Sequence, residues 1–275
     1  MLEQEEMQPN QEEKKILNHL STPYSLLGIG IGFFALSILA SIYLVIIALF
    51  FKGKDLNNEA ISSSLYALVY FFAYGSTAIL LILILRLPTL KKIFRKWKNI
   101  DSFGKGILYG VVLLFSTVFF SIIIKVLCPD VGNNVNESQL ETIMKHSPFL
   151  SFFFIVIFAP FTEELTYRYC LFGEIYKKKR WIAYLVCGLI FGFIHFDLTG
   201  IFQKTSQEAL NEWLNLPIYI FSGLFLCFVY EKEDNLICPI VAHLVNNLYA
   251  FTMTIIASNM GEQISSISSM IFIPF

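Results

Sequence analysis

The chain has 275 residues, of which 56% are hydrophobic and only 15% charged, and its mean hydropathy is +0.63. A soluble globular domain carries about 25% charged residues, so this composition excludes a soluble enzyme, a disordered chain and a nucleic-acid-binding protein. The 20 basic and 21 acidic residues nearly cancel, so the formal net charge of -1 gives no global field that points to a partner.

Seven long apolar blocks follow one another along the chain. The hydrocarbon core of a bilayer is about 30 Å thick and needs about 20 apolar residues per helix. Backbone groups in lipid must be satisfied within the segment, so these blocks predict helices. The blocks are Leu20–Phe51, Ala60–Leu85, Gly106–Ile124, Pro148–Gly173, Trp181–Phe196, Trp213–Tyr230 and Leu236–Ala257.

The predicted fold is therefore all-α: a polytopic transmembrane helix bundle with about seven spans (seven or eight), because the first block is long for one span. Residues 1–19 are polar and predicted as a cytoplasmic tail, residues 20–257 as the transmembrane domain, and residues 258–275 as a short interfacial tail. Basic residues concentrate in Arg86–Lys105 and in Lys177–Arg180. Because cytoplasmic loops carry an excess of Lys and Arg, this pattern predicts a cytoplasmic N-terminus.

The fourth block contains Glu163, Glu164 and Arg168. An ionisable side chain at the centre of a membrane costs about 2.5–3.5 kcal/mol on insertion scales, so each needs a partner. Glu164 and Arg168 are four positions apart on a helix and can neutralise each other. Glu163 points about 100° away and has no partner in its own helix. A spare acid in an apolar site is suited to general-base catalysis, although a structural polar contact explains this segment about equally well.

Two imidazoles and an amide occur in later blocks. His195 lies four residues after Phe191, and His243 and Asn247 are four positions apart, so the latter two share one helix face. Asn246, three positions after His243, is the alternative candidate for the role of Asn247. Taken alone, each of these residues is also explained by hydrogen bonding between helices.

Depth in the membrane favours a shared site. Counted from the cytoplasmic end of each helix, Glu163 lies about 17 Å and His195 about 21 Å deep. His243 lies about 12 Å and Asn247 about 18 Å deep. Three helices thus bring an acid, two imidazoles and an amide to one layer of the bilayer, which unrelated polar residues would rarely do.

Two reactions fit this layer. In the first, Glu163 with His195 activates a water molecule. His243 and Asn247 then donate hydrogen bonds to the developing oxyanion, and a peptide bond is hydrolysed without a cofactor. In the second, Glu163, His195 and His243 hold a zinc ion with water in its open position. We expect the metal-free reaction.

The motifs EExxxR (163–168), FxxxH (191–195) and HxxxN (243–247), in this order and each on its own membrane helix, resemble the CPBP family. This family, also called Abi, comprises type II CAAX prenyl endopeptidases and bacteriocin-processing or bacteriocin-immunity proteins. The resemblance covers about Pro148–Ala257.

The resemblance implies an intramembrane CAAX-type protease that acts on a membrane-associated peptide or protein, of the glutamate type rather than a zinc metalloendopeptidase. It also implies a multi-pass protein of the bacterial cytoplasmic membrane, in contact with the lipid bilayer. The implied catalytic residues are Glu163, His195, His243 and Asn247, with Glu164 and Arg168 supporting them.

Two other functions fit a membrane bundle with a polar layer. A non-catalytic bacteriocin self-immunity or membrane scaffold protein would keep its function when Glu163 and His195 are replaced. A transporter would use the polar layer as a proton or ion site. The absence of an internal repeat and the odd number of spans disfavour the transporter.

Overall fold

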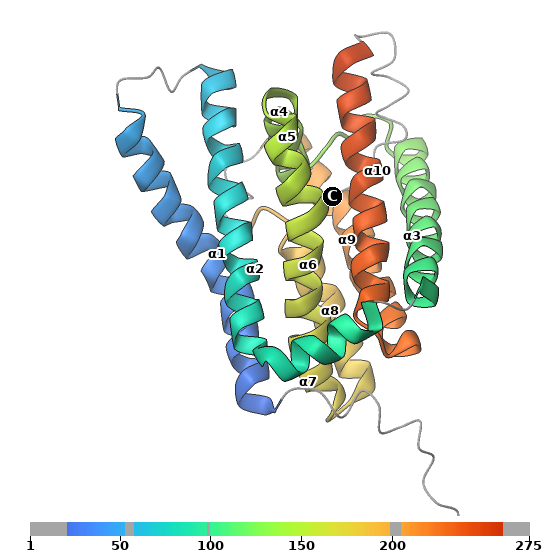
Figure 1. Cartoon of the computed structure of the whole chain (residues 1–275). Coiled ribbons are helices and arrows are strands. Elements are labelled where there is room, and N and C mark those ends of the chain that lie inside the picture. The colour runs from blue at the N-terminus through green and yellow to red at the C-terminus, as the bar shows by residue number, and fades with distance from the viewer. Residues whose placement is uncertain (1–20, 53–57, 98–99, 199–204, 261–275) are drawn as a thin grey trace, which may run out of the picture.

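The computed structural model describes residues 21–52, 58–97, 100–198 and 205–260. Every regular element within these ranges is a helix, which confirms the predicted all-α fold (Figure 1). The predicted N-terminal tail, 1–19, and most of the predicted C-terminal tail, 258–275, lie outside the described residues.

Six helices of the described ranges are long and apolar enough to cross a membrane. Together with one shorter apolar helix, α8, they form the predicted polytopic bundle. The six are α1 (Thr22–Phe50), α2 (Glu59–Trp97), α3 (Ile100–Leu127), the composite helix Pro148–Tyr176, α9 (Ser206–Glu233) and α10 (Ile237–Met260).

The fifth predicted span, Trp181–Phe196, is shorter in the structure than the sequence suggested. Its helix α8 (Arg180–Phe193) has 14 residues, or about 21 Å, against a hydrocarbon core of about 30 Å. The chain turns directly after Phe193, and His195 lies in this turn. His195 is thus presented from the end of a short helix rather than from the flank of a full span.

The predicted cytoplasmic loop Arg86–Lys105 is also largely helical. The helix α2 continues to Trp97, and α3 begins at Ile100. Leu, Lys and Arg are good helix formers, so this basic stretch continues the helix beyond its apolar part. Figure 1 shows this end of α2 bending beneath the bundle.

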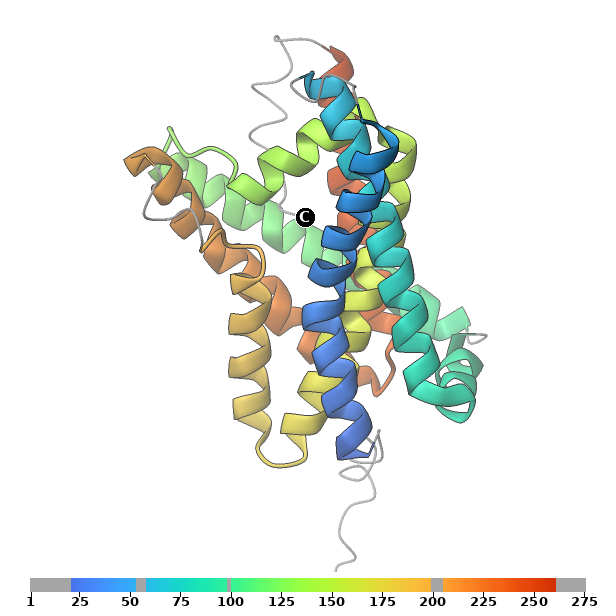
Figure 2. The same ribbon diagram turned by 90° about the vertical axis from the view of Figure 1, so that its left-hand side faces the viewer.

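The fourth span is a composite helix at the centre of the bundle (Figures 1 and 2). It packs against α1, α2, α8 and α10. Two of its segments are π-helical, a wider form that is often found at functional sites. The segments are α5 (Pro148–Ser151), η3 (Phe152–Phe158), α6 (Ala159–Glu163), η4 (Glu164–Phe172) and α7 (Gly173–Tyr176).

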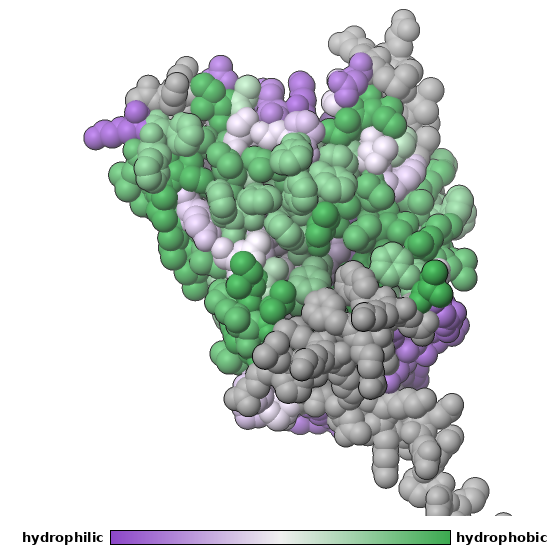
Figure 3. Space-filling view, viewed as in Figure 1, coloured by the Kyte–Doolittle hydropathy of each residue, from purple (hydrophilic) through white to green (hydrophobic). Residues whose placement is uncertain are grey.

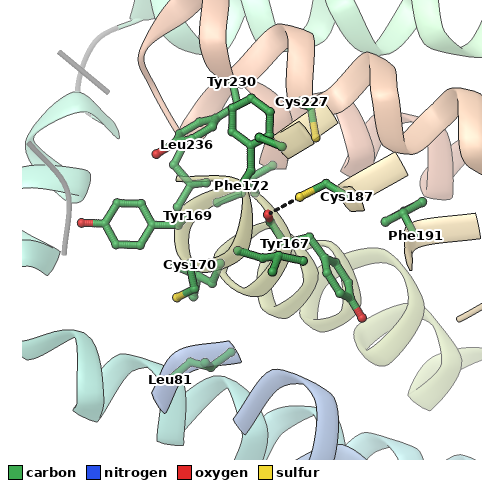
Figure 4. Close-up of a cluster of buried hydrophobic side chains, with 14 of the residues drawn as sticks. Leu81, Tyr167, Tyr169, Cys170, Phe172, Cys187, Phe191, Cys227, Tyr230 and Leu236 are labelled. Carbon is green, nitrogen blue, oxygen red and sulfur yellow. Dashed lines mark hydrogen bonds between the residues drawn. The ribbon is translucent and has the colours of Figure 1, made fainter. Parts of the chain in front are cut away.

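A buried apolar cluster anchors η4 to its neighbours (Figure 4). Phe172 of η4 packs edge-on against Tyr230 of α9, with ring centroids 6.1 Å apart. The Sγ atom of Cys187 on α8 lies 3.7 Å from the carbonyl oxygen of Tyr167. The residues beside the charged part of the fourth span are therefore held in a packed core.

The outer surface is hydrophobic around the middle of the molecule, and hydrophilic side chains gather toward its ends (Figure 3). Phe34 of α1, Leu83 of α2 and Phe115 of α3 are 67%, 68% and 70% exposed. Large exposed apolar faces are unusual on soluble monomers, and these three lie on helices long enough to span a bilayer. The chain is therefore a multi-pass membrane protein that fits a lipid environment.

Helices α8 and α9 approach closely where glycines face each other. A Cβ atom on Gly223 of α9 would lie 2.8 Å from the Cβ atom of Phe191 and 3.2 Å from the Cα atom of Gly188. Small residues allow the backbones of membrane helices to meet at such short range. This close approach brings the backbone of Gly223 and the ring of Phe191 next to the fourth span.

Candidate active site

All four side chains predicted to be catalytic line one cavity of about 330 Å³. Glu163 comes from α6, His195 from the turn after α8, and His243 and Asn247 from α10. The remaining walls are mostly apolar and aromatic, with hydroxyl groups between them. They include Phe33, Tyr70, Tyr74, Thr77, Leu140, Phe154, Thr162, Thr166 and Tyr167.

The ion pair expected within the fourth span is present behind this cavity. The Nη1 atom of Arg168 lies 2.9 Å from the Oε1 atom of Glu164, and both side chains are fully buried. Arg168 also donates from Nη2 to the carbonyl oxygen of Gly223 at 3.2 Å. The guanidinium group is therefore fixed by a carboxylate in its own helix and by the backbone of α9.

Glu164 has a second partner that the sequence did not reveal. The Nδ1 atom of His243 lies 2.8 Å from the same Oε1 atom of Glu164. Because an ionised carboxylate only accepts hydrogen bonds, this contact makes Nδ1 the donor. The Nε2 atom of His243 then points toward Glu163, with 4.0 Å between Nε2 and the Oε2 atom of that acid.

Glu163 is the acid that remains without a fixed partner. Its Oε2 atom is buried and has no hydrogen-bond partner among the described residues. The 4.0 Å to His243 exceeds hydrogen-bond range but still allows strong electrostatic interaction in an apolar site. The structure thus separates the two adjacent carboxylates: Glu164 is held on two sides, and Glu163 faces the cavity.

His195 is held with one nitrogen available. Its Nδ1 atom lies 2.8 Å from the carbonyl oxygen of Phe191, which can only accept, so Nδ1 carries the proton. Its ring stacks on Tyr219 of α9, with centroids 4.5 Å apart and planes at 12°. In the neutral ring Nε2 is therefore the nitrogen that can accept a proton or a hydrogen bond, and the residue lines the cavity.

Phe191 links the parts of the site, a role that the FxxxH motif alone did not indicate. Its ring centroid lies 5.0 Å from that of His195 and 5.8 Å from that of His243. The guanidinium carbon of Arg168 lies 4.5 Å from the same ring, within the range of a cation–π interaction. One aromatic ring thus packs against both imidazoles and the buried cation.

Asn247 contacts the fourth span through its amide. Its Nδ2 atom donates to the carbonyl oxygen of Ile155 at 3.0 Å. In η3 the backbone N–H of Ala159 bonds to Phe154 rather than to Ile155, and Pro160 has no N–H to offer. Asn247 therefore satisfies a carbonyl group that the helix leaves without a donor, and its second N–H is free to face the cavity.

Tyr219 and Glu137 are neighbours of the site that sequence reasoning missed. The Tyr219 hydroxyl donates to the Oε1 atom of Glu137 at 2.7 Å. Glu137 lies in the first turn of α4 (Val135–His146) and forms a capping box with Asn134. The capping pattern is readable in the sequence, whereas the contact with Tyr219, 82 residues away, is not.

Three residues were considered as zinc ligands in the alternative reaction: Glu163, His195 and His243. Within the described part of the chain, no group of three or more His, Cys, Asp or Glu side chains is placed to hold a metal ion. The side chains as placed therefore do not fit a bound zinc ion.

The comparisons with known proteins agree with these motifs. Residues 145–249 match the family model described as Rce1-like, type II CAAX prenyl endopeptidase. This match agrees with the family resemblance of the three motifs over these residues. The matched segment contains the six predicted site residues.

Named relatives are bacterial. The putative membrane peptidase YdiL of Bacillus subtilis is 26% identical over 76% of this chain and 82% of its own length. The membrane-embedded CAAX protease MroQ of Staphylococcus aureus is 24% identical over 72% of this chain and 75% of its own length. No solved structure matches significantly. These similarities support an endopeptidase function in a membrane.

Glu137 predicts a pH-dependent stability. Burial raises the pKa of its carboxyl group from 4.5 to about 7, and the hydrogen bonds from Tyr219 and from the backbone of Asn134 offset only part of this shift. Between these two values the folded protein holds a proton that the unfolded chain has released. The free energy of unfolding should therefore fall as the pH rises from about 4.5 to about 7.

Thermal unfolding of the detergent-solubilised protein, compared with that of Glu137→Gln, measures this effect. We expect the unfolding midpoint of the parent to fall relative to that of Glu137→Gln as the pH rises across this range. Above this range the difference between the two midpoints should stay constant. Parallel pH profiles of the two proteins would contradict the burial of an acid at this position.

Proposed function

We propose that this chain is an intramembrane endopeptidase that hydrolyses a peptide bond of a membrane-associated peptide or protein. The observation that carries the proposal is the shared cavity: the carboxylate of Glu163, which has a buried oxygen without a partner, lines the same space as His195, His243 and Asn247. The match to a family of endopeptidases supports it.

Glu163 and His195 activate the water. The Glu163 carboxylate accepts a proton from a water molecule in the cavity, and the oxygen of that water attacks the carbonyl carbon of the scissile bond. The Nε2 atom of His195 accepts a hydrogen bond from the second O–H group of the water and so orients it, and this hydrogen stays on the attacking oxygen. Glu163 then delivers its proton to the nitrogen of the leaving amine, which returns the carboxylate to its starting state.

His243 and Asn247 stabilise the oxyanion that develops on the substrate carbonyl. Asn247 uses the N–H that is not bound to Ile155. His243 donates from Nε2, which requires a doubly protonated ring because Nδ1–H already bonds to Glu164. Fixed donors in a water-poor cavity are effective because they need no reorganisation during the reaction.

Glu164 and Arg168 support the reacting groups without touching substrate. The Glu164 carboxylate orients the His243 ring by accepting from its Nδ1 atom, and Arg168 balances the charge of Glu164. We place the protein in the bacterial cytoplasmic membrane with a cytoplasmic N-terminus, as the bacterial relatives and the basic segments favour.

Replacing the two water-activating residues tests the reaction. We expect Glu163→Gln and His195→Ala each to lower kcat by at least about 100-fold, the usual range for loss of a general base. The assay is cleavage of a fluorogenic membrane peptide by purified protein. Asp130→Asn, an exposed acid outside the cavity, is the control and should cleave at the parental rate. Equal cleavage by parent and both variants would refute the proposal.

The metal-free mechanism has its own test. We expect activity to persist after dialysis against a strong chelator, with less than one zinc ion in ten protein molecules by elemental analysis. Stoichiometric zinc in active protein, combined with loss of activity on chelation and recovery on adding zinc, would show instead that the reaction depends on a metal.

A further inference from the structure

A second, larger cavity is lined mainly by residues near the starts of α2, α4 and α9. The helices α2 and α4 begin at the end of the bundle opposite α7 (Figure 1). The cavity encloses about 600 Å³, and we call it the vestibule. The vestibule is lined by Glu59, Ser62, Ser63, Tyr66, Tyr70, Asn133, Val135, Ser138, Gln139, Thr142, Ile143 and Glu208.

The vestibule adjoins the catalytic cavity. Tyr70 of α2 and Gln139 and Ile143 of α4 line both spaces. The helix α4 divides them, because Asn136 and Leu140 face the catalytic cavity whereas Ser138 and Thr142 face the vestibule. A peptide bound at Glu163 that extends past Tyr70, Gln139 and Ile143 would reach the vestibule.

The lining differs in chemistry from that of the catalytic cavity. Most vestibule side chains carry a hydroxyl, amide or carboxylate group, whereas the walls of the catalytic cavity are mostly apolar and aromatic. Among the residues that the structure describes, the charged lining residues of the vestibule are two acids, Glu59 and Glu208. Lys125 and Lys145, on neighbouring elements, do not line it.

The acid of α9 is fixed in position. The Oε2 atom of Glu208 accepts hydrogen bonds from the backbone N–H and from the hydroxyl of Thr205, both at 2.8 Å. Three carboxylates, those of Glu59, Glu208 and Glu163, thus lie along the path through the two cavities. Charges of one sign along a cleft attract the opposite charge.

We infer that the vestibule binds the hydrophilic, positively charged segment of the peptide substrate that adjoins the scissile bond. This inference rests on the proposed function, since it names a feature of the substrate of the same site. The apolar cavity takes the membrane-embedded part of the peptide, and the vestibule takes the part that leaves the membrane. A phosphate-bearing lipid headgroup fits poorly, because it would meet carboxylates of its own sign.

Binding tests the inference without requiring cleavage. Two labelled peptides share one apolar segment and carry either a lysine-rich or a glutamate-rich flank. Their affinities for full-length Glu163→Gln protein in nanodiscs are measured by fluorescence anisotropy. We expect the lysine-rich peptide to bind at least about 10-fold more tightly at low salt, with a smaller ratio at high salt.

Two pairs of substitutions, each of which removes two acids, show whether the vestibule causes the preference for the lysine-rich peptide. Adding Glu59→Gln and Glu208→Gln should reduce the affinity ratio to less than about 2-fold. The control pair Asp101→Asn and Glu233→Gln also removes two acids, but from the residues that bind Lys105 and that do not line the vestibule. The control should keep the full ratio. A ratio near one in the starting protein, or a ratio unchanged by the vestibule substitutions, would overturn the inference.

The same peptides separate this inference from the proposed function. Cleavage that depends on Glu163 but shows no preference for the lysine-rich flank would contradict the inferred role of the vestibule. It would still support the proposed endopeptidase function. A charge preference in binding, with no cleavage of either peptide by the parent protein, would contradict the proposed endopeptidase function. It would still support the inferred role of the vestibule.

Discussion

The buried carboxylate of Glu164 is the interaction on which the rest of the site depends. A lone ionised group at this depth would cost several kcal/mol, and removing one partner of a buried pair typically costs about 3–5 kcal/mol. The Oε1 atom of Glu164 contacts both Arg168 and His243, whereas its Oε2 atom is buried without a hydrogen-bond partner among the described residues. This contact joins the fourth span to α10 and, through Arg168, to α9. It also leaves the neighbouring Glu163 as the acid that faces the cavity.

Irregular backbone places the other groups around this contact. The π-helical turn before Pro160 leaves the Ile155 carbonyl without a helical donor, and Asn247 supplies one. The early end of α8 places His195 in a turn where the Phe191 carbonyl fixes its protonated nitrogen. Both features depart from an ideal helix, and both orient a side chain toward the same cavity. Their cost is offset by the packing of the surrounding bundle.

The sequence was sufficient for the fold class and for part of the site. Long apolar blocks predict membrane helices because lipid leaves the backbone few alternatives, and the spacing of Glu164 and Arg168 predicted an ion pair that the structure contains. It was insufficient for the length of α8, since apolar character continues past the point where the helix ends. The contacts of Glu164 with His243 and of Glu137 with Tyr219 join residues 79 and 82 positions apart. Local periodicity carries no information about such contacts.

A comparison of two neighbouring isosteric substitutions tests the central claim most directly. Glu163→Gln and Glu164→Gln make the same chemical change one residue apart, and thermal unfolding in detergent measures the effect on stability. Glu164→Gln should lower the free energy of unfolding by about 3 kcal/mol or more, because it leaves Arg168 buried without its counter-charge. Glu163→Gln should leave stability unchanged or raise it, because among the described residues no ion pair shorter than 4.0 Å holds that carboxylate. Equal losses from both substitutions, or a larger loss from Glu163→Gln, would contradict the division of roles between the two acids.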